Sequence, residues 1–370
     1  MIGYHPTPWR SATAVLIKKA RKPEYPSPKA YRIICLLSCT VKLLERVIAR
    51  RLAFTGTKHG LLAPSQFSGR PGRSALDAAA MLESFVRDSL SRNRRRSPSR
   101  LTVSAVTMDI QAAFDRVDKA YLDLSLLRMG YPAHLRRWVD SFLFDRRISF
   151  SFNGKTDQPR HAGRGVPQGS PFSPILCLPY ASALRASPNG EPRFTLDKRI
   201  SGLQLSYVDD FCVAVSSPSG GAKAIRENSE ALYRVTSQLT EQAVRIGLTF
   251  DPSKTELIHF SRRRAPTEET VPLPGGVVAH PADAVRYLGF FIDRKLDWQQ
   301  HVQHRANLAS AVLSSLARLK TIQQATTVRP VSKYGPELWC TSSGRIVKIL
   351  RMIPILFASI SPASALQIER

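Results

Sequence analysis

Three aspartates in this sequence stand in surroundings where acidic residues are unusual. Asp209 and Asp210 are adjacent within SYVDDFCVAV, residues 206–215, which is otherwise apolar and rich in residues that favour strands. Asp109 lies at the end of a similar run, LTVSAVTMDI at 101–110. Carboxylates gathered in a half-buried place repel one another and raise each other's pKa, so something must offset the repulsion.

A divalent cation would provide that offset. Carboxylate oxygens are ligands that Mg²⁺ prefers, together with the phosphate oxygens of a substrate. Two such ions about 4 Å apart serve in-line phosphoryl or nucleotidyl transfer. This chemistry requires Asp109 to lie beside the 209–210 pair, which follows if their strands are neighbours. The plain alternative is an Asp-Asp hairpin turn, and for these two residues alone that interpretation is favoured because aspartate is common in turns.

The charge balance points to a polyanionic partner. The 370 residues carry 54 Lys and Arg against 28 Asp and Glu, a net charge of +26, while the 43% hydrophobic content is that of an ordinary globular protein. Residues 1–100 alone hold 20 basic against 5 acidic residues. A solvated face explains any single basic run but not this excess, so we expect nucleic acid first and an anionic membrane surface second.

Cysteines and apolar segments exclude several other classes. The five cysteines are scattered without a CxxC pair, which is typical of reduced thiols and not of a disulfide framework or a zinc site. The most apolar stretch of the tail, IPILFASI at 353–360, is far shorter than the roughly 20 residues of a membrane span. We therefore expect no membrane segment.

Periodicity and turn residues indicate mixed α and β structure. Helices are predicted over 40–52, with Val41, Leu44, Val47, Ile48 and Leu52 on one face, over 77–90 with Asp77 as N-cap, and over 118–129, 133–144 and 222–247. Strands are predicted over 101–110, 147–154, 203–215 with its turn at the aspartates, 255–260 and 285–292. The segments 18–32, 61–75 and 91–100 are predicted as loops, and a helix begins near 297. This order predicts an α+β fold whose sheet packs on helices.

Seven segments, taken in order, resemble the motifs of one family, the reverse transcriptases of non-LTR (LINE-like) retrotransposons, and most closely those of filamentous fungi. They are AYRIICLLSCTVKLLERVIARRL, SQFSGRPGRSALDA, TMDIQAAFDRVDKAYL, GVPQGSPFSPIL, SYVDDFCVAV, GLTFDPSKTELIHF and VRYLGFFIDRKLDW. The resemblance implies a right-hand polymerase fold. It places basic fingers at 1–100, a catalytic palm with interleaved fingers elements at 101–296, a partial thumb or connection at 297–345 and an irregular tail at 346–370.

The resemblance also implies roles for matching residues. Asp109, Asp209 and Asp210 would hold two Mg²⁺ ions, with Mn²⁺ as an alternative, and Lys254 would be a general acid at the leaving pyrophosphate or else a solvated turn lysine. Phe114 would lie under the deoxyribose and exclude a 2′-hydroxyl, unless it is a core aromatic. The remaining expected contacts to nucleotide, template or primer come from Lys19, Arg32, Arg70, Arg73, Gln168, Gly169 and Tyr207.

The implied function is RNA-directed DNA polymerase, which adds dNTPs to a DNA primer on an RNA template. The segments that would carry an endonuclease or RNase H domain are not recognised, so we expect a fragment of such an element, feebly active or inactive. A nuclear location is expected, with mitochondrion and cytoplasm left open, and protein partners are unknown. The competing hypotheses are a catalytically inactive nucleic-acid-binding remnant, an RNA-templated RNA polymerase and a group II intron maturase.

Overall fold

The computed structural model describes residues 3–19, 30–91, 101–152, 154–261 and 268–322. Two compact units divide the chain, one ending at Asp297 and the other beginning at Trp298. The described part of the second unit is Trp298 and helix α7 (Gln299–Ile322). Of the arginine-rich loop predicted at 91–100, Ser91 belongs to a helix and the rest lies outside the described residues, as does the expected tail at 346–370.

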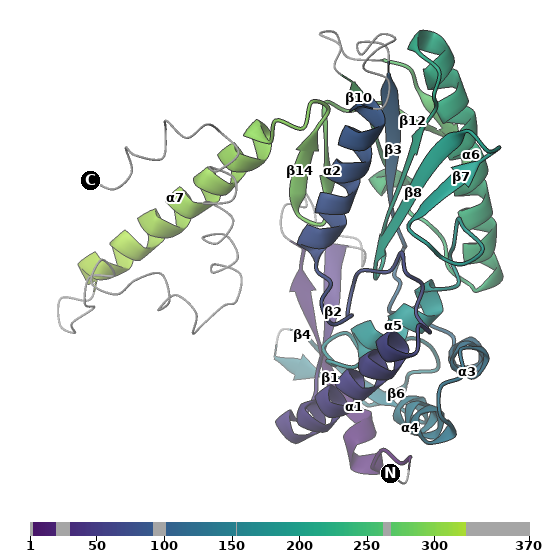
Figure 1. The fold of residues 1–370 in the computed structure, drawn as a ribbon. Helices are drawn as coiled ribbons and strands as arrows, with labels where there is room; N and C mark the ends of the chain where they lie inside the picture. The colour runs from purple at the N-terminus through teal and green to yellow at the C-terminus, as the bar shows by residue number, and fades with distance from the viewer. Residues whose placement is uncertain (1–2, 20–29, 92–100, 153, 262–267, 323–370) are drawn as a thin grey trace. The chain divides into compact units, whose positions relative to one another are not determined.

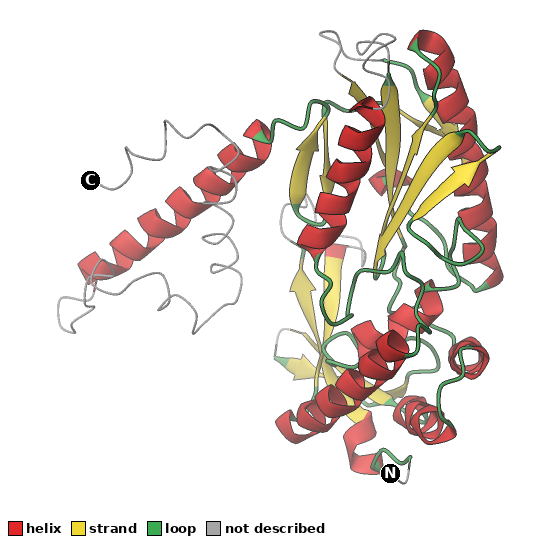
Figure 2. Cartoon of the chain, in the orientation of Figure 1, coloured by secondary structure: helices red, strands yellow, loops and turns green. Residues whose placement is uncertain are grey.

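The first unit contains two five-stranded sheets with helices around them (Figures 1 and 2). One sheet, here called the carboxylate sheet, has the strand order β10-β3-β9-β8-β7 and is antiparallel throughout. Its strands are β3 (Thr102–Asp109), β7 (Arg193–Leu196), β8 (Ile200–Tyr207), β9 (Asp210–Ser216) and β10 (Glu256–Ser261).

Both faces of the carboxylate sheet are covered, because almost every residue of its central strands is buried and an open face would leave alternate residues exposed. Helix α6 (Gly221–Arg245) packs on β3 and β9, and α2 (Ala75–Ser91) packs on β3 and β8. Figure 1 shows these two helices flanking the sheet. The helix predicted over 222–247 corresponds to α6, and its apolar residues Ile225, Leu232, Val235, Leu239, Ala243 and Ile246 are all buried.

Side-chain alternation assigns the aspartates to one face of this sheet. Val106 and Met108 of β3, with Phe211 and Val213 of β9, join α6 in the main core cluster. Successive side chains of a strand point to opposite faces, so Asp109 and Asp210 lie on the face away from α6.

The other sheet, here called the N-terminal sheet, has the order β2-β1-β4-β5, with β6 beside β4. Its strands are β1 (Ser11–Lys18), β2 (Tyr31–Leu36), β4 (Arg147–Phe152), β5 (Lys155–Thr156) and β6 (Arg160–His161). Strand β1 pairs in parallel with β4, more than a hundred residues later. The β1 and β2 strands were not predicted, because the Lys- and Pro-rich segment between them dominates the local pattern.

Helices α1 (Cys39–Lys58) and α5 (Ser173–Ala181) contact each other beside the N-terminal sheet, near α3 (Lys119–Arg128) and α4 (Ala133–Leu143) (Figure 1). The predicted face of α1 is wrong at one position, since Val47 is 43% exposed. Glu45 is buried in its place. The N-cap prediction for α2 is also wrong: the helix begins at Ala75, and the Ser74 hydroxyl and the Asp77 carboxylate bond reciprocally to each other's backbone amides in a capping box.

The segment 285–292, predicted as one strand, is a hairpin of β13 (Ala284–Tyr287) and β14 (Phe290–Asp293). Leu288 and Gly289 both have positive φ, at 51° and 85°, which reverses the chain in a two-residue turn. A second small hairpin is formed by β11 (Val271–Leu273) and β12 (Val277–Ala279), joined by the 3-10 turn η4 (Pro274–Gly276). Further 3-10 turns are η1 (Thr7–Arg10) and η3 (Pro252–Lys254).

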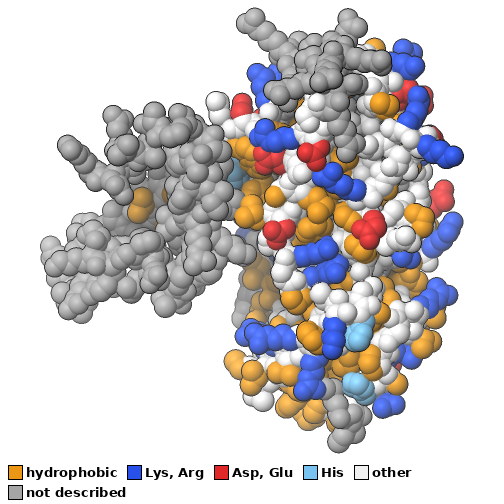
Figure 3. Space-filling model, viewed as in Figure 1, with side chains coloured by type: hydrophobic (Ala, Val, Ile, Leu, Met, Phe, Trp, Pro, Cys, Tyr) orange, Lys and Arg blue, Asp and Glu red, His pale blue; other side chains and the backbone are white. Residues whose placement is uncertain are grey.

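On the face in Figure 3, Lys and Arg side chains outnumber Asp and Glu and are spread over the first unit. Within the described ranges, no helix has the length and apolarity needed to cross a membrane.

Candidate active site at the ends of strands β3 and β9

Asp109 and Asp210 are direct partners in the antiparallel register of β3 and β9. Residues paired in this way have Cα atoms about 4.5–5.5 Å apart and side chains on the same face. Two carboxylates separated by a hundred residues of sequence are therefore neighbours. The condition on which the polymerase interpretation rests, that Asp109 lies beside the 209–210 pair, is met.

Asp209 occupies the turn between β8 and β9. Tyr207 pairs with Asp210, which leaves Val208 and Asp209 as the two connecting residues, and Val208 takes a positive φ of 59°. The Asp209 carbonyl accepts a hydrogen bond from the Ile110 amide at 2.9 Å, and the Val208 amide donates to the Ser68 hydroxyl at 3.1 Å. The turn is thus held from β3 on one side and from the 61–73 loop on the other.

Burial and mutual repulsion raise the pKa of two of these carboxyls. Burial is the larger cause for Asp210, followed by the charges of Asp209 and Asp109, and together they raise its pKa to about 6, against the opposing charges of Lys254 and Arg286. Burial and then the charge of Asp109 also raise the pKa of Asp209. The site therefore holds more negative charge than its own side chains neutralise.

Lys254 forms an ion pair with Asp109. The lysine lies at the end of η3, where Asp251 accepts from the Ser253 amide at 3.1 Å, and the Asp251 amide itself donates to the Asp109 carbonyl at 2.8 Å. Burial disfavours the charged amine, but the hydrogen bond and charge of Asp109 outweigh it and raise the pKa of Lys254. The predicted lysine is therefore at the carboxylate site and protonated at neutral pH.

The donor set fits a divalent cation by its chemistry. Three aspartates lie at the adjoining ends of β3 and β9, two of them have raised pKa values, and positive charge placed among them would lower those pKa values again. In the arrangement that the structure describes, no three acidic, histidine or cysteine side chains are placed as ligands around one point, and Lys254 is bonded to Asp109. Cys35 and Cys39 likewise belong to no such group among the described residues.

Gln168 and Gly169 lie on a loop that touches β2 closely. The Gln168 carbonyl accepts from the Cys35 amide at 2.6 Å, and its side-chain amide donates to Asp115 at 3.2 Å. Gly169 has φ of 122°, and a Cβ atom built there would come within 2.4 Å of the Cys35 carbonyl oxygen. The expectation that a small residue allows close backbone approach at this position agrees with that geometry.

Phe114 is half-buried, packs against the main core cluster, and its carbonyl accepts from the Val166 amide at 2.8 Å. Phe114 thus borders the loop that carries Gln168. The Gln168 side chain forms a hydrogen bond with Asp115, the residue that follows Phe114. Both of the alternatives for Phe114, a core aromatic and a sugar-facing one, are compatible with a side chain that is part core and part surface.

The guanidinium groups of Arg70 and Arg73 are directed to the chain's own backbone. Arg70 donates to the Ala63 carbonyl at 2.9 Å. Arg73 donates to the Pro64 and Gln66 carbonyls and lies 4.8 Å from the centre of the Phe67 ring. These contacts order the loop beside β8, and the template contact expected of both arginines stays a prediction.

Lys19 and Arg32 are at the edge of the N-terminal sheet. Lys19 follows β1, with its amide bonded to the Ala30 carbonyl at 2.8 Å, and Arg32 is exposed on β2, opposite Ile17. Both residues therefore belong to a different sheet from the aspartates, and their triphosphate role also stays a prediction.

Arg286 was not anticipated from the sequence. Its charge lowers the pKa of Asp210, and its amide donates to Glu256 of β10 at 2.9 Å. Tyr287 beside it is fully buried, and this burial, with smaller contributions from Cys212 and Asp210, raises its pKa. A prediction of the Leu288-Gly289 turn would have revealed this hairpin, because glycine after a β-prone run is a turn signal.

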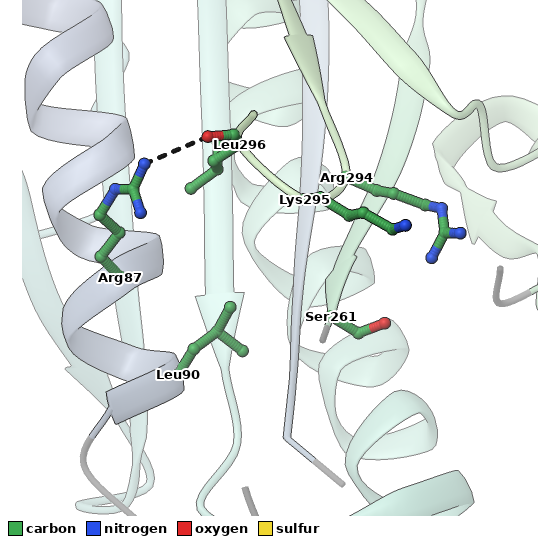
Figure 4. A pocket seen from close by; sticks show the side chains of 6 residues that line it. All are labelled: Arg87, Leu90, Ser261, Arg294, Lys295 and Leu296. Carbon is green, nitrogen blue, oxygen red and sulfur yellow. Dashed lines mark hydrogen bonds between the residues drawn. The ribbon is translucent and has the colours of Figure 1, made fainter. Parts of the chain in front are cut away.

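A cavity of about 330 Å³ lies elsewhere in the first unit, lined by Arg87, Leu90, Ser261, Arg294, Lys295 and Leu296 (Figure 4). Arg87 donates to the Leu296 carbonyl at 3.1 Å and pairs with Glu83. Arg294 pairs with Asp283 at 3.4 Å. The cavity includes none of the aspartates and is not the carboxylate site.

Comparisons with known proteins agree with this geometry. The family model for reverse transcriptase (RNA-dependent DNA polymerase) matches residues 17–292. The chain is 28% identical over 350 residues to a probable RNA-directed DNA polymerase from transposon BS of Drosophila melanogaster, covering 91% of this chain and 36% of that protein. It is 27% identical over 318 residues to the RNA-directed DNA polymerase from mobile element jockey of the same species, covering 86% and 32%.

Among solved structures, apo telomerase from Candida tropicalis matches with a TM-score of 0.50 and 13% identity, over 79% of this chain and 48% of that one. This likeness concerns the fold alone, and it agrees with a right-hand polymerase fold. The division into fingers, palm and thumb stays a prediction. The chain spans about a third of the length of the curated relatives it matches. The chain belongs to the reverse transcriptase family, and its relatives identify it as the reverse transcriptase domain of a non-LTR retrotransposon.

Proposed function

We propose that this chain catalyses RNA-directed DNA synthesis, adding dNTPs to the 3′-hydroxyl of a DNA primer on an RNA template. The observation that carries the proposal is the pairing of Asp109 with Asp210, with Asp209 in the adjoining turn. Family membership supports the reaction type. The net charge of +26 supports a polyanionic template, held through its backbone.

Asp109, Asp209 and Asp210 are the residues proposed to hold divalent cations, two Mg²⁺ ions or Mn²⁺ in their place. When bound, such ions make the primer hydroxyl more acidic and neutralise charge on the transferring phosphates. Lys254, protonated and adjacent to Asp109, is suited to give a proton to the leaving pyrophosphate. Phe114, Gln168 and Gly169 border the proposed nucleotide position, and Tyr207 pairs with Asp210 at the primer side.

Two finer expectations belong to the same proposal. An element acting on chromosomal DNA would place the protein in the nucleus, with mitochondrion or cytoplasm as alternatives. A filamentous-fungal type of element stays a prediction that rests on the sequence motifs, since the relatives described above are from Drosophila melanogaster.

The test is primer extension by the purified chain on an RNA template with Mg²⁺, comparing wild type with Asp209→Asn. The substitution keeps the size of the side chain and removes a charged ligand, so extension is expected to fall by a factor of about 100 or more, as for loss of a key catalytic group. RNA binding by both proteins serves as the control for folding.

The competing function is a nucleic-acid-binding remnant without catalysis. The Lys254–Asp109 ion pair favours it to the extent that a lysine already neutralises one carboxylate. It predicts equal RNA binding by wild type and Asp209→Asn, with no extension by either. Incorporation of NTPs as readily as dNTPs would instead indicate an RNA polymerase.

A further inference from the structure

A group of buried polar residues lies beneath the loop that carries Gln168 and Gly169. Glu45 of α1 and Ser170 are both buried, and the Ser170 hydroxyl donates to Glu45 Oε2 at 2.6 Å. Ser170 directly follows the two residues proposed to border the nucleotide. A short, charge-assisted bond of this kind is among the stronger ones available inside a protein.

The Ser170 side chain is at the centre of the local hydrogen bonding. Its oxygen also accepts from the Phe172 amide at 3.0 Å, just before α5 begins. Ser173 donates to the Pro167 carbonyl at 2.9 Å, and the Cys35 amide donates to the Gln168 carbonyl at 2.6 Å. The loop is therefore fixed from three directions: β2 by backbone contact, α5 by its first turn, and α1 through Glu45.

Several neighbouring groups favour the charged form of the buried Glu45 carboxylate. Burial raises the pKa of Glu45, while the Ser170 hydrogen bond and then the charges of Arg146 and Lys42 act in the opposite direction. Arg146 is 3% exposed and donates to the Phe142 carbonyl at 3.0 Å. His5 lies 3.9 Å from Glu45, but burial, with Arg146 and Arg10, lowers its pKa to about 4, so it is neutral at pH 7.

Several other buried polar atoms around Glu45 form no hydrogen bonds with one another. Glu45 Oε1, Arg146 Nη2 and both ring nitrogens of His5 are buried and have no hydrogen-bond partner among the described residues. Such groups are costly, and a core position for stability alone would be better filled by apolar side chains. The presence of these costly groups around the bond between Glu45 and Ser170 points to a role for that bond.

We propose that Glu45 is a positioning residue for nucleotide binding: its carboxylate holds Ser170 and thereby sets the place of Gln168 and Gly169. The proposal rests on the proposed function in assigning that loop to the incoming dNTP. Glu45 does not itself touch the reacting atoms, since it is fully buried under the loop.

The test compares Ser170→Ala with Ser217→Ala in the full chain. Both substitutions remove a buried serine that donates to a glutamate, but the Ser217 partner is Glu227, at the end of the carboxylate sheet away from the loop. Ser170→Ala is expected to raise the KM for dNTP about tenfold with kcat changed less than about threefold, while Ser217→Ala leaves KM unchanged. Glu45→Gln, whose amide oxygen can still accept from Ser170, is expected to restore most of the dNTP affinity that Glu45→Ala loses.

Amide hydrogen exchange separates this proposal from the function on which it rests. The amides of Cys35, Gln168, Gly169, Ser170 and Phe172 should exchange about tenfold faster in Ser170→Ala, and at the wild-type rate in Ser217→Ala, whether or not the chain extends a primer. Unchanged exchange in Ser170→Ala overturns the positioning role. So does an unchanged KM for dNTP in a chain that is active. If Ser170→Ala exchanges faster but the wild-type chain extends no primer, the proposal that Ser170 and Glu45 hold the loop stands, and the polymerase function is rejected.

Discussion

Lys254 and Asp109, 145 residues apart in sequence, form an ion pair at the end of strand β3. The lysine thus neutralises the same carboxylate that is proposed to hold a divalent cation. The Lys254 amine and a divalent cation would bind to the same carboxylate oxygens of Asp109. The lysine and the cation are therefore expected to compete.

Lys254→Ala should therefore separate binding from catalysis. Removing the amine frees Asp109, so apparent Mg²⁺ affinity, measured by calorimetry, is expected to rise by roughly threefold to tenfold. Extension is expected to fall about 100-fold if the amine is a general acid. Lys119→Ala, which breaks the ion pair with Asp140, is the matched control and should change neither quantity. Weaker Mg²⁺ binding in Lys254→Ala would contradict the competition.

The pH dependence of stability provides a second prediction. The pKa of Asp210 is raised in the folded state from 3.8 to about 6. The folded chain therefore holds this proton more tightly, and stability without divalent cations should fall as pH rises from about 4 to about 6. Asp210→Asn should remove that part of the dependence and stabilise the metal-free chain at pH 7 by on the order of 1–2 kcal/mol, allowing for partial solvent exposure.

Urea unfolding at pH 4, 5, 6 and 7 in the presence of a chelator measures this effect. The difference between Asp210→Asn and wild type should grow through that range and level off above pH 6. Added Mg²⁺ should stabilise wild type more than the variant, because a ligand that binds only the folded state adds to its stability. A constant difference at every pH would show that Asp210 keeps its ordinary pKa.

Gly169→Ala is expected to distort the loop that carries Gln168 and Gly169. The new Cβ would lie 2.4 Å from the Cys35 carbonyl oxygen and would sit on a backbone with φ of 122°. Either the loop at Gly169 or strand β2 at Cys35 must move, which should lower the free energy of unfolding by about 2–4 kcal/mol, measured by thermal or urea unfolding. Gly72→Ala is the control for positive φ alone, because nothing lies within 4 Å of its Cβ position. Equal losses in the two variants would mean that the close approach to Cys35 is unimportant.

Arg73→Ala tests whether this arginine contacts the template or supports its own loop. The bonds to the Pro64 and Gln66 carbonyls and the contact with Phe67 predict a loss of stability of about 1–2 kcal/mol. The salt dependence of RNA binding should then keep its slope, with the exposed Arg128→Ala as a surface-charge control. A slope reduced by about one in a stable variant would instead reveal a phosphate contact.

Phe114→Val distinguishes the two interpretations of the half-buried aromatic. If the ring lies under the sugar, a smaller side chain should admit a 2′-hydroxyl, and the ratio of kcat/KM for dNTP to that for NTP should fall about tenfold or more. If the ring only packs in the core, stability should fall while the ratio stays the same. Measuring both quantities on one preparation decides between them.

The sequence by itself determined the family to which this protein belongs. Motifs of consecutive residues, such as MDIQAAF, PQGSP and YVDD, carry the family resemblance, and the period of α6 and the run of β3 were predictable because each depends on neighbours along the chain. The basic excess is likewise a property of the composition alone.

Only the tertiary structure decided which residues meet. The register of β3 and β9 pairs Asp109 with Asp210, and the β13–β14 hairpin carries Arg286, whose charge lowers the pKa of Asp210. The burial of Glu45 in place of Val47, and the use of Arg70 and Arg73 within their own loop, depend on contacts with segments distant along the chain. Local sequence governs backbone propensity, but partners and burial are set by long-range packing, which periodicity does not encode.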